Sequence, residues 1–170
     1  MNSMLKKCLA LFMVIFIMSA SLAAFAKENT ETVIIPSYTE EQIQEYNKNL
    51  AFLKAVGVWT SPYTDHINKV TRAEFASALA GLCNLDKTSA VPLTYSDVTA
   101  DTQFAEDIYA VGIAGLMVGS DNMFRPNEYI TFNQAAKAVV TALGYGGIAN
   151  SKGGYPNGFC SVAMNLDLVV

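Results

Sequence analysis

Two segments of the chain repeat each other at a fixed offset, and this repeat limits the architecture more than any other sequence feature. Residues 70–85 match residues 130–145 without gaps, at an offset of 60. Upstream, Gly57 matches Gly115 at an offset of 58, so the loop between the two matched parts differs by two residues. Such self-similarity indicates one helix–loop–helix unit used twice, whose copies stack to bury a shared core.

The predicted helices of these units have clear start signals. A Thr followed three positions later by Glu or Gln is the pattern of a capping box. It occurs at Thr39, Thr71 and Thr131. Apolar residues then recur at steps of three and four, as on one face of a helix. The helices are predicted to end near Gly57, Asn84 and Gly144, which are residue types that favour helix ends. The last helix is expected to be stopped by Gly146 and Gly147 as well as by Gly144.

Two more helices are predicted on weaker signals. Asp101 or Thr102 is expected to cap a helix. Its inner face would be formed by Phe104, Ile108, Val111 and Ala114. Pro156 suits the first turn of a later helix, and residues 93–98 are expected to be extended. The predicted fold class is therefore all-α.

The first segment of the chain has the pattern of a secretory signal peptide. Lys6 and Lys7 precede an apolar stretch from Cys8 to Met18, and small residues at Ala24 and Ala26 fit a cut after Ala26. The alternative is a membrane anchor, for which the apolar stretch is short. Residues 1–26 are thus predicted to direct export, residues 27–38 to form a polar leader, and the mature chain to contain no membrane span.

The charge of the chain excludes some partners. The net charge is −4, and removal of Lys6 and Lys7 with the signal peptide leaves nine Lys and Arg against 15 Asp and Glu, a net charge of −6. Binding to nucleic acid or to an anionic membrane surface needs clustered Lys and Arg. No nucleic-acid partner is therefore expected.

No catalytic or metal-binding constellation is found in the sequence. His66 is the only histidine, and no cluster of Cys and His accompanies it. The mature chain has two cysteines, Cys83 and Cys160. Export permits a disulfide between them, but two small buried side chains are the preferred interpretation. The protein is predicted to be no enzyme and to need no cofactor or metal.

These segments resemble the S-layer homology (SLH) repeats of bacterial cell-surface proteins. Val70–Ala76, which reads Val-Thr-Arg-Ala-Glu-Phe-Ala, is similar to the most recognisable motif of such a repeat. Tyr95–Val98, Gly115–Met117 and Phe124–Asn127 resemble its opening, middle and loop segments, and Gly153–Phe159 resembles the start of a further copy. The resemblance divides the chain into a first repeat at 39–90, a second repeat at 91–147 and the start of a truncated third repeat at 148–170.

The resemblance implies both an architecture and a function. Repeats of this family pack as an all-α, pseudo-threefold bundle, which would be incomplete here. They hold exported proteins on the bacterial cell wall by binding an anionic secondary wall polysaccharide, often one that carries pyruvate ketals. The Arg of the motif contributes to the carbohydrate pocket. Here that residue is Arg72, whereas the second repeat has Phe132 at the matching position.

The predicted polysaccharide-binding residues are Thr71, Arg72, Glu74 and Trp59. Thr71 and Glu74 would mainly fix the start of a helix. Arg72 would be the first helical residue and point outward, beside free N–H groups that suit an anion. The alternative for Arg72 is a solvated first-turn residue.

Aromatic and cationic loop residues have two interpretations each. Trp59, Tyr63 and Tyr155 offer faces on which a sugar ring can stack, but a buried anchor between helices is the preferred interpretation of Trp59. Arg125 is either part of an anion site or a solvated loop charge, and the second is preferred.

A rival hypothesis places the function in protein contacts. The change from Arg72 to Phe132 between repeats indicates a domain that has drifted towards protein–protein interaction or S-layer assembly, with S-layer or envelope proteins as partners. Without a sixth helix, the apolar stripe of the last predicted helix and the residues Leu166, Leu168, Val169 and Val170 would be partly uncovered. A fragment, an early-terminated product or a subunit completed by a second copy is therefore expected.

Overall fold

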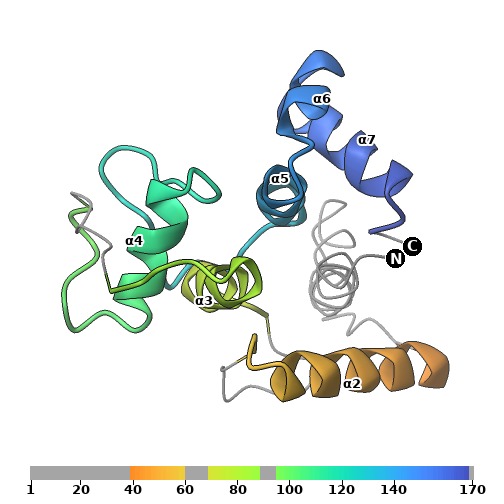
Figure 1. The fold of residues 1–170 in the computed structure, drawn as a ribbon, viewed down its shortest axis with the longest axis horizontal. Coiled ribbons are helices and arrows are strands. Elements are labelled where there is room, and N and C mark those ends of the chain that lie inside the picture. Colours follow the sequence, from red (N-terminus) through yellow and green to blue (C-terminus); the bar gives the residue numbers. More distant parts are fainter. Residues whose placement is uncertain (1–38, 60–68, 89–94, 169–170) are drawn as a thin grey trace, which may run out of the picture.

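The computed structural model describes residues 39–59, 69–88 and 95–168. This part of the chain is helical, and its β-structure consists of two isolated bridges. The helices, labelled as in Figure 1, are α2 (Glu40–Ala55), α3 (Arg72–Cys83), α4 (Ala105–Ile113), α5 (Phe132–Ala142), α6 (Gly146–Ser151) and α7 (Asn157–Asn165). The predicted all-α fold class is confirmed.

The three predicted capping boxes are present. Thr39, Thr71 and Thr131 each accept the N–H of the residue three positions later, and the side chain of that residue accepts the N–H of the Thr. The boxes satisfy backbone groups that a helix start leaves without a partner. They explain why α2, α3 and α5 begin where the sequence predicts.

The helix ends show the internal repeat in backbone geometry. Gly57 and Gly115 follow α2 and α4 with φ of 70° and 69°, a region that glycine adopts without a steric penalty. The carbonyl of Leu53 accepts two N–H groups after the first of these turns, and the carbonyl of Val111 accepts two after the second. The two helix ends are therefore equivalent, as the offset of 58 predicts.

The core is built on the small residues of α3 and α5. Ala76, Leu79, Ala136 and Val139 are fully buried. Figure 1 shows α3 and α5 end-on in the middle of the view, with α4 beside α3, and α6 and α7 beside α5. α3 packs against α4, and α5 packs against α6 and α7.

Three local predictions are wrong. The residue before α4 is Phe104, with φ of 63° and no side-chain cap, because the Thr102 hydroxyl instead accepts the N–H of Thr99 at 2.8 Å. The predicted stop at Gly146 and Gly147 is the start of the short helix α6. Tyr95–Val98, the described part of the predicted extended segment, contains a turn.

Other sequence predictions lie outside the described residues. These are the signal peptide at 1–26, the leader at 27–38, and the interpretations of Tyr63 and His66. Within 39–59, 69–88 and 95–168, none of the helices combines the length and apolar character needed to cross a bilayer.

Candidate functional site

The start of α3 is joined to the loop before α5 by backbone hydrogen bonds. The N–H of Arg72 donates to the carbonyl of Glu128 at 2.8 Å, and the N–H of Ala73 donates to the carbonyl of Pro126 at 3.0 Å. The N–H of Glu74 donates to the Thr71 hydroxyl at 3.2 Å. The expectation that this helix start offers free N–H groups to an anion is therefore wrong for its first three residues.

The side chain of Arg72 points inward, contrary to the outward direction expected for a first-turn residue. Arg72 is only 7% exposed. Its Nε donates to the carbonyl of Phe124 at 2.8 Å, and its Nη2 lies 3.4 Å from the carbonyl of Val118. The guanidinium also lies over the Phe124 ring, 4.7 Å from its centre. These contacts with the 118–124 loop hold the guanidinium in one position.

The carboxylate of Asp97 shapes the loop that holds Arg72. It accepts the N–H of Phe124 at 2.8 Å and the N–H of Arg125 at 2.7 Å. Asp121, Asn122 and Arg125 have φ of 54°, 56° and 60°, so the loop turns sharply. Hydrogen bonds to a carboxylate are stronger than neutral ones, and they fix the Phe124 carbonyl that Arg72 contacts.

Arg72 is a buried cation. Among the described residues, no carboxylate lies within ion-pair distance of its guanidinium, although Glu128 and Asp97 act on it from further away. Burial lowers the pKa of Arg72, and the more distant carboxylate of Glu128 raises it. The guanidinium still stays protonated in a protein. Among the described residues, its hydrogen-bond acceptors are the carbonyls of Phe124 and Val118, so its other N–H donors can serve a ligand or water.

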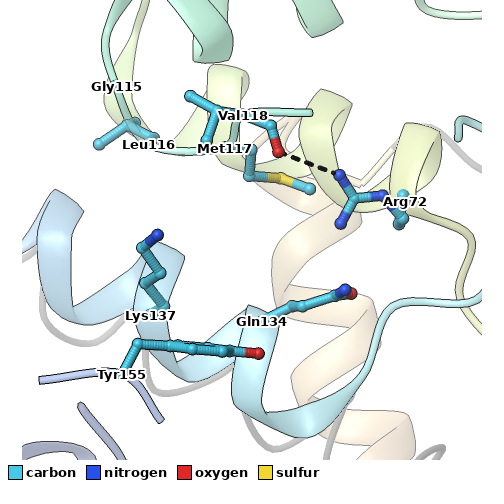
Figure 2. A pocket seen from close by; sticks show the side chains of 8 residues that line it. All are labelled: Arg72, Gly115, Leu116, Met117, Val118, Gln134, Lys137 and Tyr155. Atoms are coloured by element: carbon cyan, nitrogen blue, oxygen red, sulfur yellow. Dashed lines mark hydrogen bonds between the residues drawn. The ribbon is translucent and has the colours of Figure 1, made fainter. Parts of the chain in front are cut away.

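A pocket of about 120 Å³ opens beside Arg72. Its lining consists of Arg72, Gly115, Leu116, Met117, Val118, Gln134, Lys137 and Tyr155. Figure 2 shows the Arg72 guanidinium and the Val118 carbonyl on one wall, and Gln134, Lys137 and Tyr155 on the facing wall. The pocket lies between the start of α3, the turn after α4, the first turns of α5 and the residue before Pro156.

The charges of this pocket have one sign. Arg72 and Lys137 supply two cations, and the lining contains no carboxylate. Lys137 Nζ lies 5.5 Å from the centre of the Tyr155 ring, which is 51% exposed. A partly desolvated pocket of two cations attracts an anion more strongly than the same charges in bulk water. The exposed ring beside it provides an apolar face.

Sequence reasoning missed Lys137. In the internal alignment Lys137 matches Ser77, which is uncharged, so the comparison of the two repeats did not point to a cation at this position. One signal was available: Lys137 follows Gln134 by three positions and therefore lies on the same face of the predicted helix.

The other predicted binding residues do not line either pocket beside Arg72. Thr71 and Glu74 form the capping box, with Thr71 N–H donating to Glu74 Oε2 at 2.8 Å. Trp59 is only 4% exposed and belongs to the hydrophobic core, which agrees with the preferred interpretation of a buried anchor. A sugar-stacking role for Trp59 finds no support in this burial, whereas Tyr155 does reach the pocket.

Arg125 lines a second pocket, of about 250 Å³, which Arg72 also lines. Its Nη1 donates to the Ser120 hydroxyl at 2.8 Å, and its Nε and Nη2 lie 3.7 Å and 3.5 Å from carboxylate oxygens of Glu128 and Asp121. Arg125 is therefore a paired loop charge, and it also lines a pocket that Arg72 shares.

No cluster that could hold a metal ion occurs in the part of the chain that the structure describes. Cys83 and Cys160 are free thiols, so the disulfide alternative is not supported. Burial raises the pKa of both thiols.

The chain is similar to two bacterial envelope proteins. It is 28% identical to the Middle cell wall protein of Brevibacillus brevis over 171 residues, which cover 98% of this chain and 15% of that protein. It is 26% identical to the Surface layer protein of Brevibacillus choshinensis over 171 residues, which cover 98% of this chain and 14% of that protein. The chain thus spans about one seventh of the length of these relatives. No family model and no solved structure matches the chain.

Both relatives are named as proteins of the cell wall or surface layer. The similarity supports the expected location, secreted and at the cell wall or S-layer, and a role related to the cell surface.

Proposed function

We propose that the protein is an SLH-type attachment module that binds an anionic secondary wall polysaccharide in the pocket beside Arg72. The proposal takes 39–90, 91–147 and 148–170 as the first repeat, the second repeat and the start of a third. The pocket then takes Arg72 from the first, Lys137 from the second and Tyr155 from the third. The similarity to a cell wall protein and a surface layer protein supports a ligand that is part of the cell wall.

The observation that carries the proposal is the burial of the Arg72 charge. A guanidinium that is 7% exposed has lost most of its hydration, and the described residues offer it no ion pair. Burial of a charge without a partner is costly. The carboxylate of a uronic acid or of a pyruvate ketal entering the pocket would provide that partner, with Lys137 as the second contact.

The expected affinity of one such site is low. A hydrogen bond to a charged group contributes about 1.5–3 kcal/mol, and association itself costs several kcal/mol. Stable retention on a wall therefore needs several modules acting together on one polymer. With a mature net charge of −6, the protein as a whole repels an anionic polymer, so the attraction has to be local.

Co-sedimentation with cell-wall fragments of the producing bacterium tests the proposal. The purified protein is expected to pellet with the fragments, and Arg72→Ala, Lys137→Ala and Tyr155→Ala are expected to remain in the supernatant. Lys152→Ala is the matched control for Lys137→Ala, because Lys152 is an exposed lysine that does not line the pocket. It should pellet like the unchanged protein.

Two results would reject the proposal: no pelleting of the unchanged protein, or equal pelleting of the Arg72 and Lys152 variants. Pelleting that survives removal of the polysaccharide from the fragments would instead favour the rival function, interaction with S-layer or envelope proteins.

A further inference from the structure

The two pockets beside Arg72 adjoin each other. Arg72, Val118 and Gln134 line both of them. A polymer that places one sugar in the pocket with Lys137 therefore has its neighbouring sugar within reach of the pocket with Arg125. This inference rests on the proposed function and extends it from a single sugar to two linked sugars.

The second pocket differs from the first in charge. Its lining contains the carboxylate of Glu128, whose Oε1 lies 3.7 Å from Arg125 Nε. The Arg125 charge is also matched by Asp121, at 3.5 Å. An anion in this pocket would meet the Glu128 carboxylate, and it would find the Arg125 guanidinium already paired. The second pocket therefore disfavours a second anionic sugar.

The polar groups of the second pocket suit hydroxyl groups. A sugar hydroxyl both donates and accepts hydrogen bonds. The Glu128 carboxylate, whose side chain is 65% exposed, accepts hydrogen bonds, and the Gln134 amide can both donate and accept them. The Ser120 hydroxyl accepts from Arg125 Nη1 at 2.8 Å and can donate its own hydrogen to a ligand. Donors and acceptors thus face the same space.

The loop that presents these groups is held before any ligand binds. The Arg125 N–H donates to the Asp97 carboxylate at 2.7 Å, and the Ser120 N–H donates to the Met123 carbonyl at 3.0 Å. Groups that are already held lose less conformational entropy on binding.

We propose that the pocket formed by Arg72, Ser120, Arg125, Glu128 and Gln134 is a second subsite, which takes an uncharged sugar linked to the anionic sugar bound beside Lys137. The protein then recognises an anionic sugar joined to a neutral one, and a polymer in which every sugar is charged binds less well.

Calorimetric titration with two kinds of synthetic probe tests the subsite. One is a methyl hexoside that carries a 4,6-pyruvate ketal, and the other is a set of disaccharides in which the same sugar is joined to a neutral hexose through different linkages. We expect at least one disaccharide to bind the unchanged protein five times or more as tightly as the monosaccharide. Glu128→Ala should reduce this gain to less than twofold, and because it removes a carboxylate that acts on Arg72, it should not weaken monosaccharide binding.

Asp121→Asn is the matched control. Asp121 also pairs with Arg125, but it does not line the pocket, and Asn tolerates its φ of 54°. This variant should keep the disaccharide gain. Equal affinity of the monosaccharide and all disaccharides, or a gain that Glu128→Ala leaves intact, would overturn the second subsite while leaving the proposed function in place. Failure of the unchanged protein to bind any probe would count against both.

Discussion

The Nε of Arg72 donates to the carbonyl of Phe124 at 2.8 Å, and the two residues are 52 positions apart in the chain. This bond ties the start of α3 to the loop before α5. Arg72 also lines both pockets. Arg72 therefore both stabilises the loop through its hydrogen bond and lines the two pockets.

Replacement of Arg72 by Met separates these two roles. Met keeps much of the volume and removes the buried charge, but it leaves the Phe124 carbonyl without its donor. An unsatisfied buried polar group costs about 1–3 kcal/mol, and relief of the buried charge offsets part of this cost. We expect Arg72→Met to lower the free energy of unfolding by less than about 2 kcal/mol and to abolish wall binding. Urea denaturation and wall sedimentation measure the two effects; a stable variant that still binds would contradict the role of the charge.

Asp97 is expected to matter more for stability than Arg72. Asp97→Ala removes the acceptor of two backbone N–H groups, those of Phe124 and Arg125. Each hydrogen bond to a charged group contributes about 1.5–3 kcal/mol, so we expect a loss of about 3 kcal/mol or more. The midpoint of urea denaturation should fall with little change in slope. A shift below about 1 kcal/mol would show that the loop does not depend on this carboxylate.

Loss of the Thr71 cap tests whether this residue is structural. Thr71→Ala removes the hydroxyl that accepts the Glu74 N–H, at a cost of about 1 kcal/mol for a typical cap. The cost should exceed that of Thr131→Ala, because Glu74 is only 7% exposed, whereas the Thr131 box is exposed. Thermal unfolding compares the two variants. Wall binding of folded Thr71→Ala should be unchanged, and a selective loss of binding would instead make Thr71 a ligand contact.

Gly119 is required by a close backbone approach. A Cβ at this position would lie 2.2 Å from the Met123 carbonyl oxygen and 2.9 Å from a ring carbon of Tyr95. The backbone would have to move, so we expect Gly119→Ala to cost about 1–3 kcal/mol and to distort the second pocket. Gly147→Ala is the control, since a Cβ there meets nothing within 4 Å. Equal unfolding midpoints of the two variants would contradict this view of the loop.

The helices could be predicted from the sequence because their signals are local. Thr71 and Glu74 are three positions apart, and the capping box they predict is present. The start of α4 could not be predicted, because a left-handed Phe104 replaces the side-chain cap. The six-residue helix α6 was hidden by two glycines that usually indicate a stop.

The candidate site could be predicted only in part. Arg72 was found through its motif, but its burial depends on the carbonyls of Val118 and Phe124, which are 46 and 52 positions away. Distant backbone carbonyls leave no pattern in the sequence, so the inward direction of Arg72 could not be foreseen. Lys137 was missed because the internal repeat places it against the uncharged Ser77, and its position opposite Arg72 is visible only in the folded chain.

The central claim is that the cations beside Arg72 recognise a carboxylate on the wall polysaccharide. The most direct measurement compares binding of the native polysaccharide with binding of the same polymer after its carboxylates have been reduced to alcohols. We expect the unchanged protein to lose binding to the reduced polymer, down to the level that Arg72→Met shows with the native one. Equal binding of the native and the reduced polymer by the unchanged protein would contradict the claim.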